Sequence, residues 1–203
     1  GVNYRLFYNG GTGNDVVLVE NSQPTVVFVD DSWAAFTGGT VISDADLGTT
    51  GSETAVFGVN AFSSITAALA AVANTTGIVI INAGTYAETV SLADGKTLEI
   101  TGPNTPGTVN INALTTAVGT NVIIEGTSTL TIGDANSQTI AGTISGSGSL
   151  TKTGAGTVTL SNANTYSGAT LVNQGVLSIS NSTALGTTGA GTTVNQANDA
   201  RLD

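Results

Sequence analysis

The chain has 203 residues and a net charge of −10, and only 9% of its residues are charged. An ordinary globular domain has roughly 25% charged residues, so Thr, Ser, Asn and Gly must cover most of this surface. Four residues are basic, Arg5, Lys96, Lys152 and Arg201, which excludes a basic patch for nucleic acid or an anionic membrane. Cys, Met and His are absent, which excludes disulfides and catalytic pairs built on Cys or His. No run approaches the roughly 20 apolar residues of a membrane helix, so we expect no membrane insertion by this segment.

The N-terminal segment, residues 1–30, is predicted to contain a β-hairpin and one further strand. Tyr4, Leu6 and Tyr8 stand at every second position, which is the periodicity of a strand. A Gly- and Asn-rich turn separates them from a run of valines that supplies the return strand. The further strand is predicted at residues 25–30, and residues 31–60 are expected to form an acidic, Gly-rich loop.

A short amphipathic helix is predicted within residues 61–72. Its apolar residues fall on one face at helical spacing: Phe62, Ile65, Leu69 and Val72. Ser63 or Ser64 can accept a hydrogen bond from the first turn as the N-cap.

From residue 77 onward, short apolar dyads at positions i and i+2 alternate with Gly, Asn and Thr turns. We identify these dyads at Ile78/Ile80, Val90/Leu92, Leu98/Ile100, Val109/Ile111, Val122/Ile124, Leu130/Ile132, Val158/Leu160 and Leu177/Ile179. Equivalent strands return about every 19–24 residues, a spacing typical of solenoid coils. A β-sandwich also uses strands of period two, but a helix that covers the first coil favours a solenoid. The expected fold is therefore all-β: a right-handed parallel β-helix over residues 61–203 with a short N-terminal capping helix, preceded by the β-hairpin.

Residues 145–179, SGSGSLTKTGAGTVTLSNANTYSGATLVNQGVLSI, resemble a known family. They are similar to the autotransporter-associated β-strand repeat, also called the passenger-associated transport repeat. The resemblance implies a β-helix in a large exported bacterial protein. The segment 8–19 looks like the end of similar repeat regions, and segments 27–34 and 61–92 resemble the start of a pectin-lyase-like right-handed β-helix.

Two acidic motifs are candidates for calcium binding. Residues 10–18 fit one copy of the nonapeptide G-G-x-G-x-D-x-U-x, with Asp15 as the acidic residue, although a plain hairpin turn needs the same residue types. Near the only tryptophan, Trp33, the loop carries Asp30, Asp31, Asp44 and Asp46. Calcium takes about 6–8 oxygen ligands, which such loops supply. The alternative is a solvated acidic loop, and we expect no obligatory cofactor.

Catalysis is not expected. A glycosidase needs two carboxylates roughly 5–10 Å apart across the sugar, and the acidic residues after position 87 are scattered among turns. The candidate lyase bases Lys96 and Lys152 are separated by more than two coils. Tyr86 and Tyr166 are expected to pack at corners of the solenoid, in preference to stacking on sugars.

We therefore expect a non-enzymatic structural protein, secreted or on the cell surface, that associates head-to-tail with itself into a filament, sheath or matrix. The hairpin offers strand edges, and the two ends of the solenoid differ, so their contact would be heterologous and could extend into an open fibre. The residues expected to carry this contact are Tyr4, Leu6, Tyr8, Val194 and Leu202. The alternative is an adhesin or carbohydrate-binding passenger module that recognises surface glycans. A polysaccharide lyase or hydrolase ranks below both.

Overall fold

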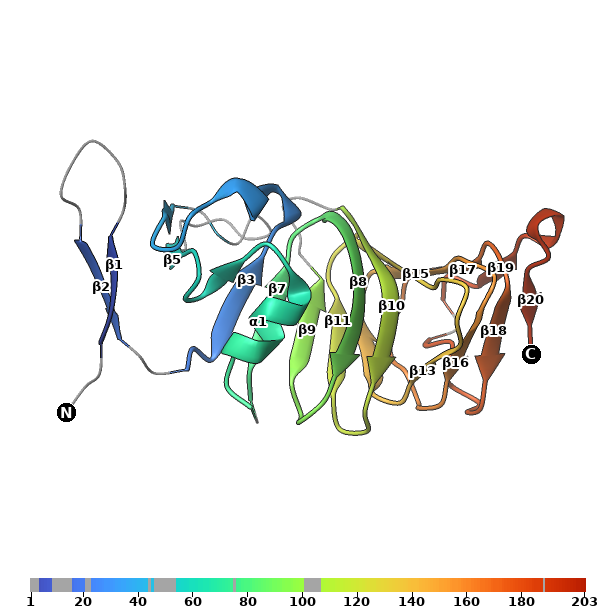
Figure 1. Ribbon diagram of the computed structural model, residues 1–203. Coiled ribbons are helices and arrows are strands. Elements are labelled where there is room, and N and C mark those ends of the chain that lie inside the picture. Colours follow the sequence, from blue (N-terminus) through green and yellow to red (C-terminus); the bar gives the residue numbers. More distant parts are fainter. Residues whose placement is uncertain are drawn as a thin grey trace.

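A computed structural model describes residues 4–8, 16–20, 23–43, 45, 54–74, 76–100, 107–187 and 189–203. Short parallel strands stack into successive coils, and these residues form a β-solenoid with one α-helix and an N-terminal hairpin (Figure 1). The expected solenoid architecture is confirmed. None of the helices in these residues is long and apolar enough to cross a membrane.

Two long strands establish two faces of the solenoid. β8 (Gly84–Leu92) and β10 (Thr108–Thr116) pair along their length, with a register shift between Ile111 and Ala113. Beyond β10, each coil has one strand on either side of that bend. These strand pairs are β12 (Thr129–Ile132) and β13 (Gln138–Ile140), β15 (Ser149–Lys152) and β16 (Thr157–Leu160), β17 (Thr170–Val172) and β18 (Val176–Ile179), and β19 (Thr192–Val194) and β20 (Arg201–Leu202).

A six-stranded parallel sheet forms the third face. Its strands, in spatial order, are β6 (Ala61–Phe62), β3 (Val26–Val29), β7 (Ile78–Ile81), β9 (Thr97–Ile100), β11 (Asn121–Ile124) and β14 (Thr143–Gly146). β3 thus precedes the helix in sequence yet lies in the same sheet as the later coils. The segments 1–30 and 61–203, which were distinguished in the sequence, therefore both contribute strands to this one sheet.

The core consists of columns of apolar side chains that run along the solenoid. In-register parallel pairing aligns Leu98 with Val79 and Val122, and Val122 with Ile144. All four side chains are buried. One dyad per strand points inward, so the alternation in the sequence is repeated in each coil. In β7 the inward residues are Val79 and Ile81, and the prediction of Ile78 and Ile80 is wrong, because Ile80 lies beside Phe28 on the outward side of the sheet.

Helix α1 (Ile65–Ala71) lies at the N-terminal end of the core. It packs against β8, β3, β6 and β7, and it buries Ile65, Ala68 and Leu69 (Figure 1). Ser64 is its N-cap, as expected, and the Ser64 Oγ accepts a hydrogen bond from Ala67 N. The helix is shorter than predicted because Ala61 and Phe62 pair with β3 as a strand.

Both ends of α1 are bound by charged residues of the first coils. The Glu88 carboxylate accepts hydrogen bonds from Ile65 N at 2.8 Å and Thr66 N at 2.9 Å. Lys96 Nζ donates to the carbonyl oxygen of Leu69 at 2.8 Å. A carboxylate at the N-terminus and an ammonium at the C-terminus satisfy free backbone groups and oppose the helix dipole.

The described part of residues 31–60 packs on the outer surface of the third face. It contains the 3-10 helix η1 (Asp31–Ala35) and an antiparallel pair, β4 (Val41–Ile42) and β5 (Ala55–Val56). These elements build a second apolar cluster on the outward side of β3: Phe28, Trp33, Ile42, Ala45, Ala55 and Ala61. This part of the segment is therefore structured, because its apolar residues cover the outward side chain of Phe28.

The N-terminal hairpin is also confirmed. β1 (Tyr4–Tyr8) pairs antiparallel with β2 (Val16–Glu20), and Leu6 lies opposite Leu18. Leu6 is 47% exposed.

Candidate functional sites

Two of the acidic calcium candidates are described, and both contact the first coil. Asp30 is 6% exposed, and its carboxylate accepts from Ser32 N at 2.9 Å and from Asn82 Nδ2 at 3.2 Å. Asp31 accepts from Thr85 N at 2.9 Å, and its carboxyl group lies directly against the Cα of Gly84. Asp15, Asp44 and Asp46 lie outside the described residues. Within those residues no three acidic side chains converge.

Asn82 joins Asp30 to the segment that covers it, and the sequence analysis missed it. Its Nδ2 also donates to the carbonyl oxygen of Ala45 at 3.2 Å. Its Oδ1 is buried and has no hydrogen-bond partner among the described residues. The sequence signal is that Asn82 directly follows the buried strand β7, so its side chain faces the segment that packs beside the end of this strand.

Tyr86 packs inside the corner beside this cluster. Its hydroxyl donates to the carbonyl oxygen of Asn82 at 2.9 Å, and Val29 O lies at 3.3 Å. Burial raises the pKa of Tyr86 well above its ordinary value, and the negative charges of Asp30 and Asp31 add to this shift. Tyr86, Tyr166 and Trp33 are all buried, which leaves none of them exposed to stack on a sugar.

Lys152 is a buried cation held by turn carbonyls. Its Nζ donates to three carbonyl oxygens, of Thr153 at 2.6 Å, Gly154 at 2.7 Å and Gln174 at 3.0 Å. Burial lowers the pKa of Lys152, and the nearby charge of Asp134 partly opposes this effect. With Lys96 bound to the end of α1, both lysines considered as lyase bases have structural partners instead. The alternation Leu150, Lys152 already predicts an inward Lys152.

Asn164 and Tyr166 organise the turn of the recognised repeat. Asn164 Oδ1 accepts from Ile144 N at 2.8 Å, and its Nδ2 donates to Ala184 O at 2.6 Å. This one side chain therefore bridges the coils on both sides of it. The Tyr166 hydroxyl lies 2.6 Å from Thr170 Oγ1, and burial raises the pKa of Tyr166.

The residues expected to mediate self-association lie in three strands. Tyr4, Leu6 and Tyr8 belong to β1. Val194 lies in β19 and Leu202 in β20, and both pack against the core while remaining partly exposed. β19 and β20 are the last strands on their two faces (Figure 1).

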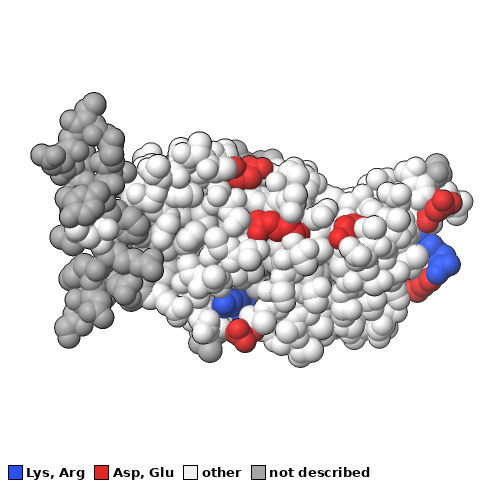
Figure 2. All heavy atoms as spheres, viewed as in Figure 1, with Lys and Arg blue, Asp and Glu red and all other residues white. Residues whose placement is uncertain are grey.

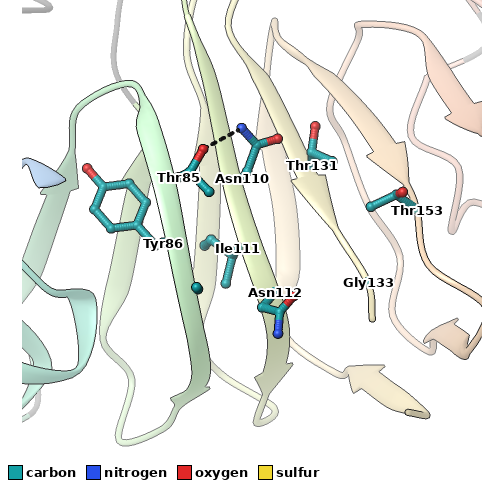
Figure 3. Close-up of a pocket in the computed structure, with 9 residues that line it drawn as sticks. Thr85, Tyr86, Asn110, Ile111, Asn112, Thr131, Gly133 and Thr153 are labelled. Carbon is teal, nitrogen blue, oxygen red and sulfur yellow. Dashed lines mark hydrogen bonds between the residues drawn. The ribbon is translucent and has the colours of Figure 1, made fainter. Parts of the chain in front are cut away.

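The outer surface carries few charges, and on the face drawn in Figure 2 they are scattered, with the basic group at the C-terminal end beside acidic groups, where Arg201 pairs with Asp203. A shallow concavity of about 130 Å³ lies over β8, β10, β12 and the turn after β15. Its polar lining includes Thr85, Asn110, Thr131 and Thr153 (Figure 3). Asn110 Nδ2 lies 3.4 Å from Thr85 Oγ1. These neutral hydroxyl and amide groups can form hydrogen bonds with a ligand but supply no charge.

Residues 150–179 match the family described as passenger-associated-transport-repeat, which confirms the repeat inferred from the sequence. No curated protein and no solved structure gives a significant match to the chain. The repeat and the β-solenoid together indicate a segment of a bacterial autotransporter passenger. Such a repeat is structural and does not define an enzyme family, and it implies a secreted or surface-exposed segment.

Proposed function

We propose that the chain is a non-enzymatic structural segment that associates with copies of itself, end to end, into a filament, sheath or matrix outside the cell. The observation that carries this proposal is the edge of the last coil. In the part of the chain that the structure describes, β19 pairs only with β17 and β20 pairs only with β18. Each therefore has one edge that no described strand pairs, and a further strand can join it.

The backbone orientation of β19 supports pairing on that edge. Thr170 N donates to Gly191 O, and Asn195 N donates to Val172 O. In a parallel ladder the N–H and C=O groups of alternate residues point to opposite neighbours. The N–H and C=O groups of Thr192 and Val194 therefore point away from β17, toward the next strand.

The partner surface that we propose is the hairpin of a second copy. β1 and β2 form a sheet of two strands, and Leu6 on β1 is half exposed. A two-stranded hairpin gains stability when a third strand or an apolar surface covers it. Contact between β1 and the β19–β20 edge is heterologous, so it can repeat into an open filament when its rotation does not close a ring.

The buried polar groups favour a structural role over catalysis. Lys96, Lys152 and Tyr166 hold a helix end, a turn and a coil corner, respectively. A catalytic group must instead reach a substrate. This supports the expectation of no enzymatic activity.

Light scattering and negative-stain microscopy over a range of protein concentrations test self-association. We expect growth of regular fibres by the parent chain and its loss in Val194→Lys and Leu202→Lys, which place a charge at the edge. Thr139→Lys is the matched control because Thr139 is exposed on a lateral face. A folded parent chain that stays monomeric at high concentration, or equal assembly by all variants, would contradict the proposal.

A second candidate function, binding of neutral glycans, rests on the concavity lined by Thr85, Asn110 and Thr131. A glycan array tests it, with the double variant Asn110→Ala/Thr131→Ala as the comparison. Binding of neutral glycans that this variant loses would favour the adhesin function. If the parent chain binds no neutral glycan, this second candidate function is excluded.

A further inference from the structure

We propose that Asp30 and Asn82 form the centre of a calcium site that fastens the segment after residue 30 to the first coil of the solenoid. Asp30 follows β3, and Asn82 follows β7, which pairs with β3. The two side chains therefore meet where both strands end. The proposal does not depend on self-association.

The first argument is the buried charge of Asp30. Asp30 is 6% exposed, and the two donors to its carboxylate among the described residues, Ser32 N and Asn82 Nδ2, are neutral. Buried charges in proteins are generally paired with an opposite charge or bound to a metal ion. Three basic side chains are described, and all have their partners elsewhere: Lys96 at α1, Lys152 at the turn after β15 and Arg201 at Asp203. A bound cation would supply the compensating charge.

The second argument is the unsatisfied oxygen of Asn82. The amide cannot be reversed, because its Nδ2 already lies between two acceptors, Asp30 Oδ2 and Ala45 O, each at 3.2 Å. The oxygen that needs a donor is therefore Oδ1. Asn82 is 2% exposed, and its Oδ1 has no partner among the described residues. A buried polar atom without a partner indicates a bound water or ion.

The set of atoms favours a cation over a water molecule. Asp30 Oδ2, Ala45 O and Asn82 Oδ1 are all acceptors grouped around one amide, and the carboxylate of Asp31 follows in the next residue. A water molecule could donate to Asn82 Oδ1 but would leave the carboxylate charge of Asp30 uncompensated, whereas a cation binds this oxygen and also compensates that charge. Carboxylate, amide and carbonyl oxygens in an irregular arrangement suit Ca²⁺ better than Mg²⁺, which requires near-ideal octahedral geometry.

Gly84 also belongs to this arrangement. A Cβ at this position would lie 2.8 Å from the Cγ and Oδ1 atoms of Asp31. Glycine therefore leaves room for the Asp31 carboxylate against the turn that follows β7. The sequence pattern that follows β7, Asn82-Ala-Gly84, provides both the amide oxygen and this space.

Titration calorimetry with CaCl₂ and terbium luminescence test the site on the full chain. Trp33 is the only tryptophan, and its backbone N–H donates to the backbone carbonyl of Asp30 at 3.2 Å, so the indole lies close enough in the chain to sensitise Tb³⁺ bound at Asp30. We expect one Ca²⁺ per chain, Trp33-sensitised Tb³⁺ emission that Ca²⁺ displaces, and a rise in the unfolding midpoint of about 5–10 °C at a hundredfold excess over Kd.

Two variants and one control separate the site from general charge effects. Asp30→Asn keeps a side chain that can cap η1 and should lose Ca²⁺ binding and Tb³⁺ emission. Asn82→Asp keeps an oxygen at the site, so it should unfold more easily in EGTA and regain stability with Ca²⁺. Asp94→Asn is the control, because Asp94 lies in a turn with φ of 59°, which Asn tolerates. No Ca²⁺ binding by the parent chain, or equal binding by Asp30→Asn, would overturn the proposal and leave a buried water as the partner of Asn82.

Discussion

Replacing Lys152 by Met tests whether the buried ammonium stabilises the solenoid. Met fills a similar volume but cannot donate, so it leaves the carbonyl oxygens of Thr153, Gly154 and Gln174 without their partner. Thr153 and Gly154 belong to the turn after β15, and Gln174 belongs to the turn of the next coil. The substitution therefore removes a link within one coil and a link between two coils.

The magnitude follows from the three carbonyls. Leaving one partly buried carbonyl oxygen without its donor costs about 1 kcal/mol, so the loss of all three bonds should lower the free energy of unfolding by about 3 kcal/mol. For a chain of this length the unfolding midpoint should fall by about 6–12 °C. Urea titration followed by circular dichroism measures the loss. Lys96→Met, which removes one such bond, should lose about 1 kcal/mol.

The pH dependence provides an independent test. Burial lowers the pKa of Lys152 below its ordinary value of 10.5, so the unfolded chain retains this proton to higher pH than the folded chain does. Stability should therefore rise with pH between the lowered pKa and 10.5, and Lys152→Met should lack this rise. A variant that is as stable as the parent at neutral pH would refute the argument, because it would mean that the desolvation cost of the ammonium equals its hydrogen bonding.

Three further predictions follow from single positions. Gly154→Ala should lower the free energy of unfolding by about 2–4 kcal/mol, because Gly154 has φ of 71° and an added Cβ would collide with the neighbouring coil. Gly119→Ala, with φ of 86° and open space around the added Cβ, should lower it by only about 1 kcal/mol, and equal losses in urea titrations would contradict this. Burial raises the pKa of Tyr166, so stability should fall above pH 10.0 as the unfolded phenol ionises, and Tyr166→Phe should flatten that fall in pH-dependent thermal unfolding. Glu88→Gln should lower the free energy of unfolding by about 1 kcal/mol, because the neutral amide has one acceptor oxygen for the two N–H groups at the start of α1 and carries no charge. An unchanged unfolding midpoint would show that water replaces the lost hydrogen bond.

The regular part of the fold was predictable because its signal is local. Each strand of the later coils carries its own alternation, and pairs such as Val122 and Ile124 point inward wherever the coil places them. The helix was predictable for the same reason, from the spacing of Ile65, Leu69 and Val72. Its true start at Ile65 was not, because a tertiary contact with β3 extends residues 61–62 as a strand.

The clusters outside the regular coils depend on contacts between distant residues. Trp33 is buried by a segment that packs over Phe28, which no local period indicates. Asn82 meets Asp30 across 52 residues of sequence. The acidic residues of the loop were visible in the sequence, but the position of the Asn82 amide beside Asp30 was not, because only pairing of β3 with β7 brings it there.

Chemical cross-linking between copies tests end-to-end association most directly. The chain has no Cys, so two introduced thiols are the only ones present. The double variant Leu6→Cys/Thr193→Cys, treated with a flexible bis-maleimide, should give a ladder of covalent oligomers well beyond the dimer. The control pair Leu6→Cys/Thr139→Cys, with its second thiol on a lateral face, should not. Monomers alone, or the same products from both pairs, would contradict head-to-tail assembly.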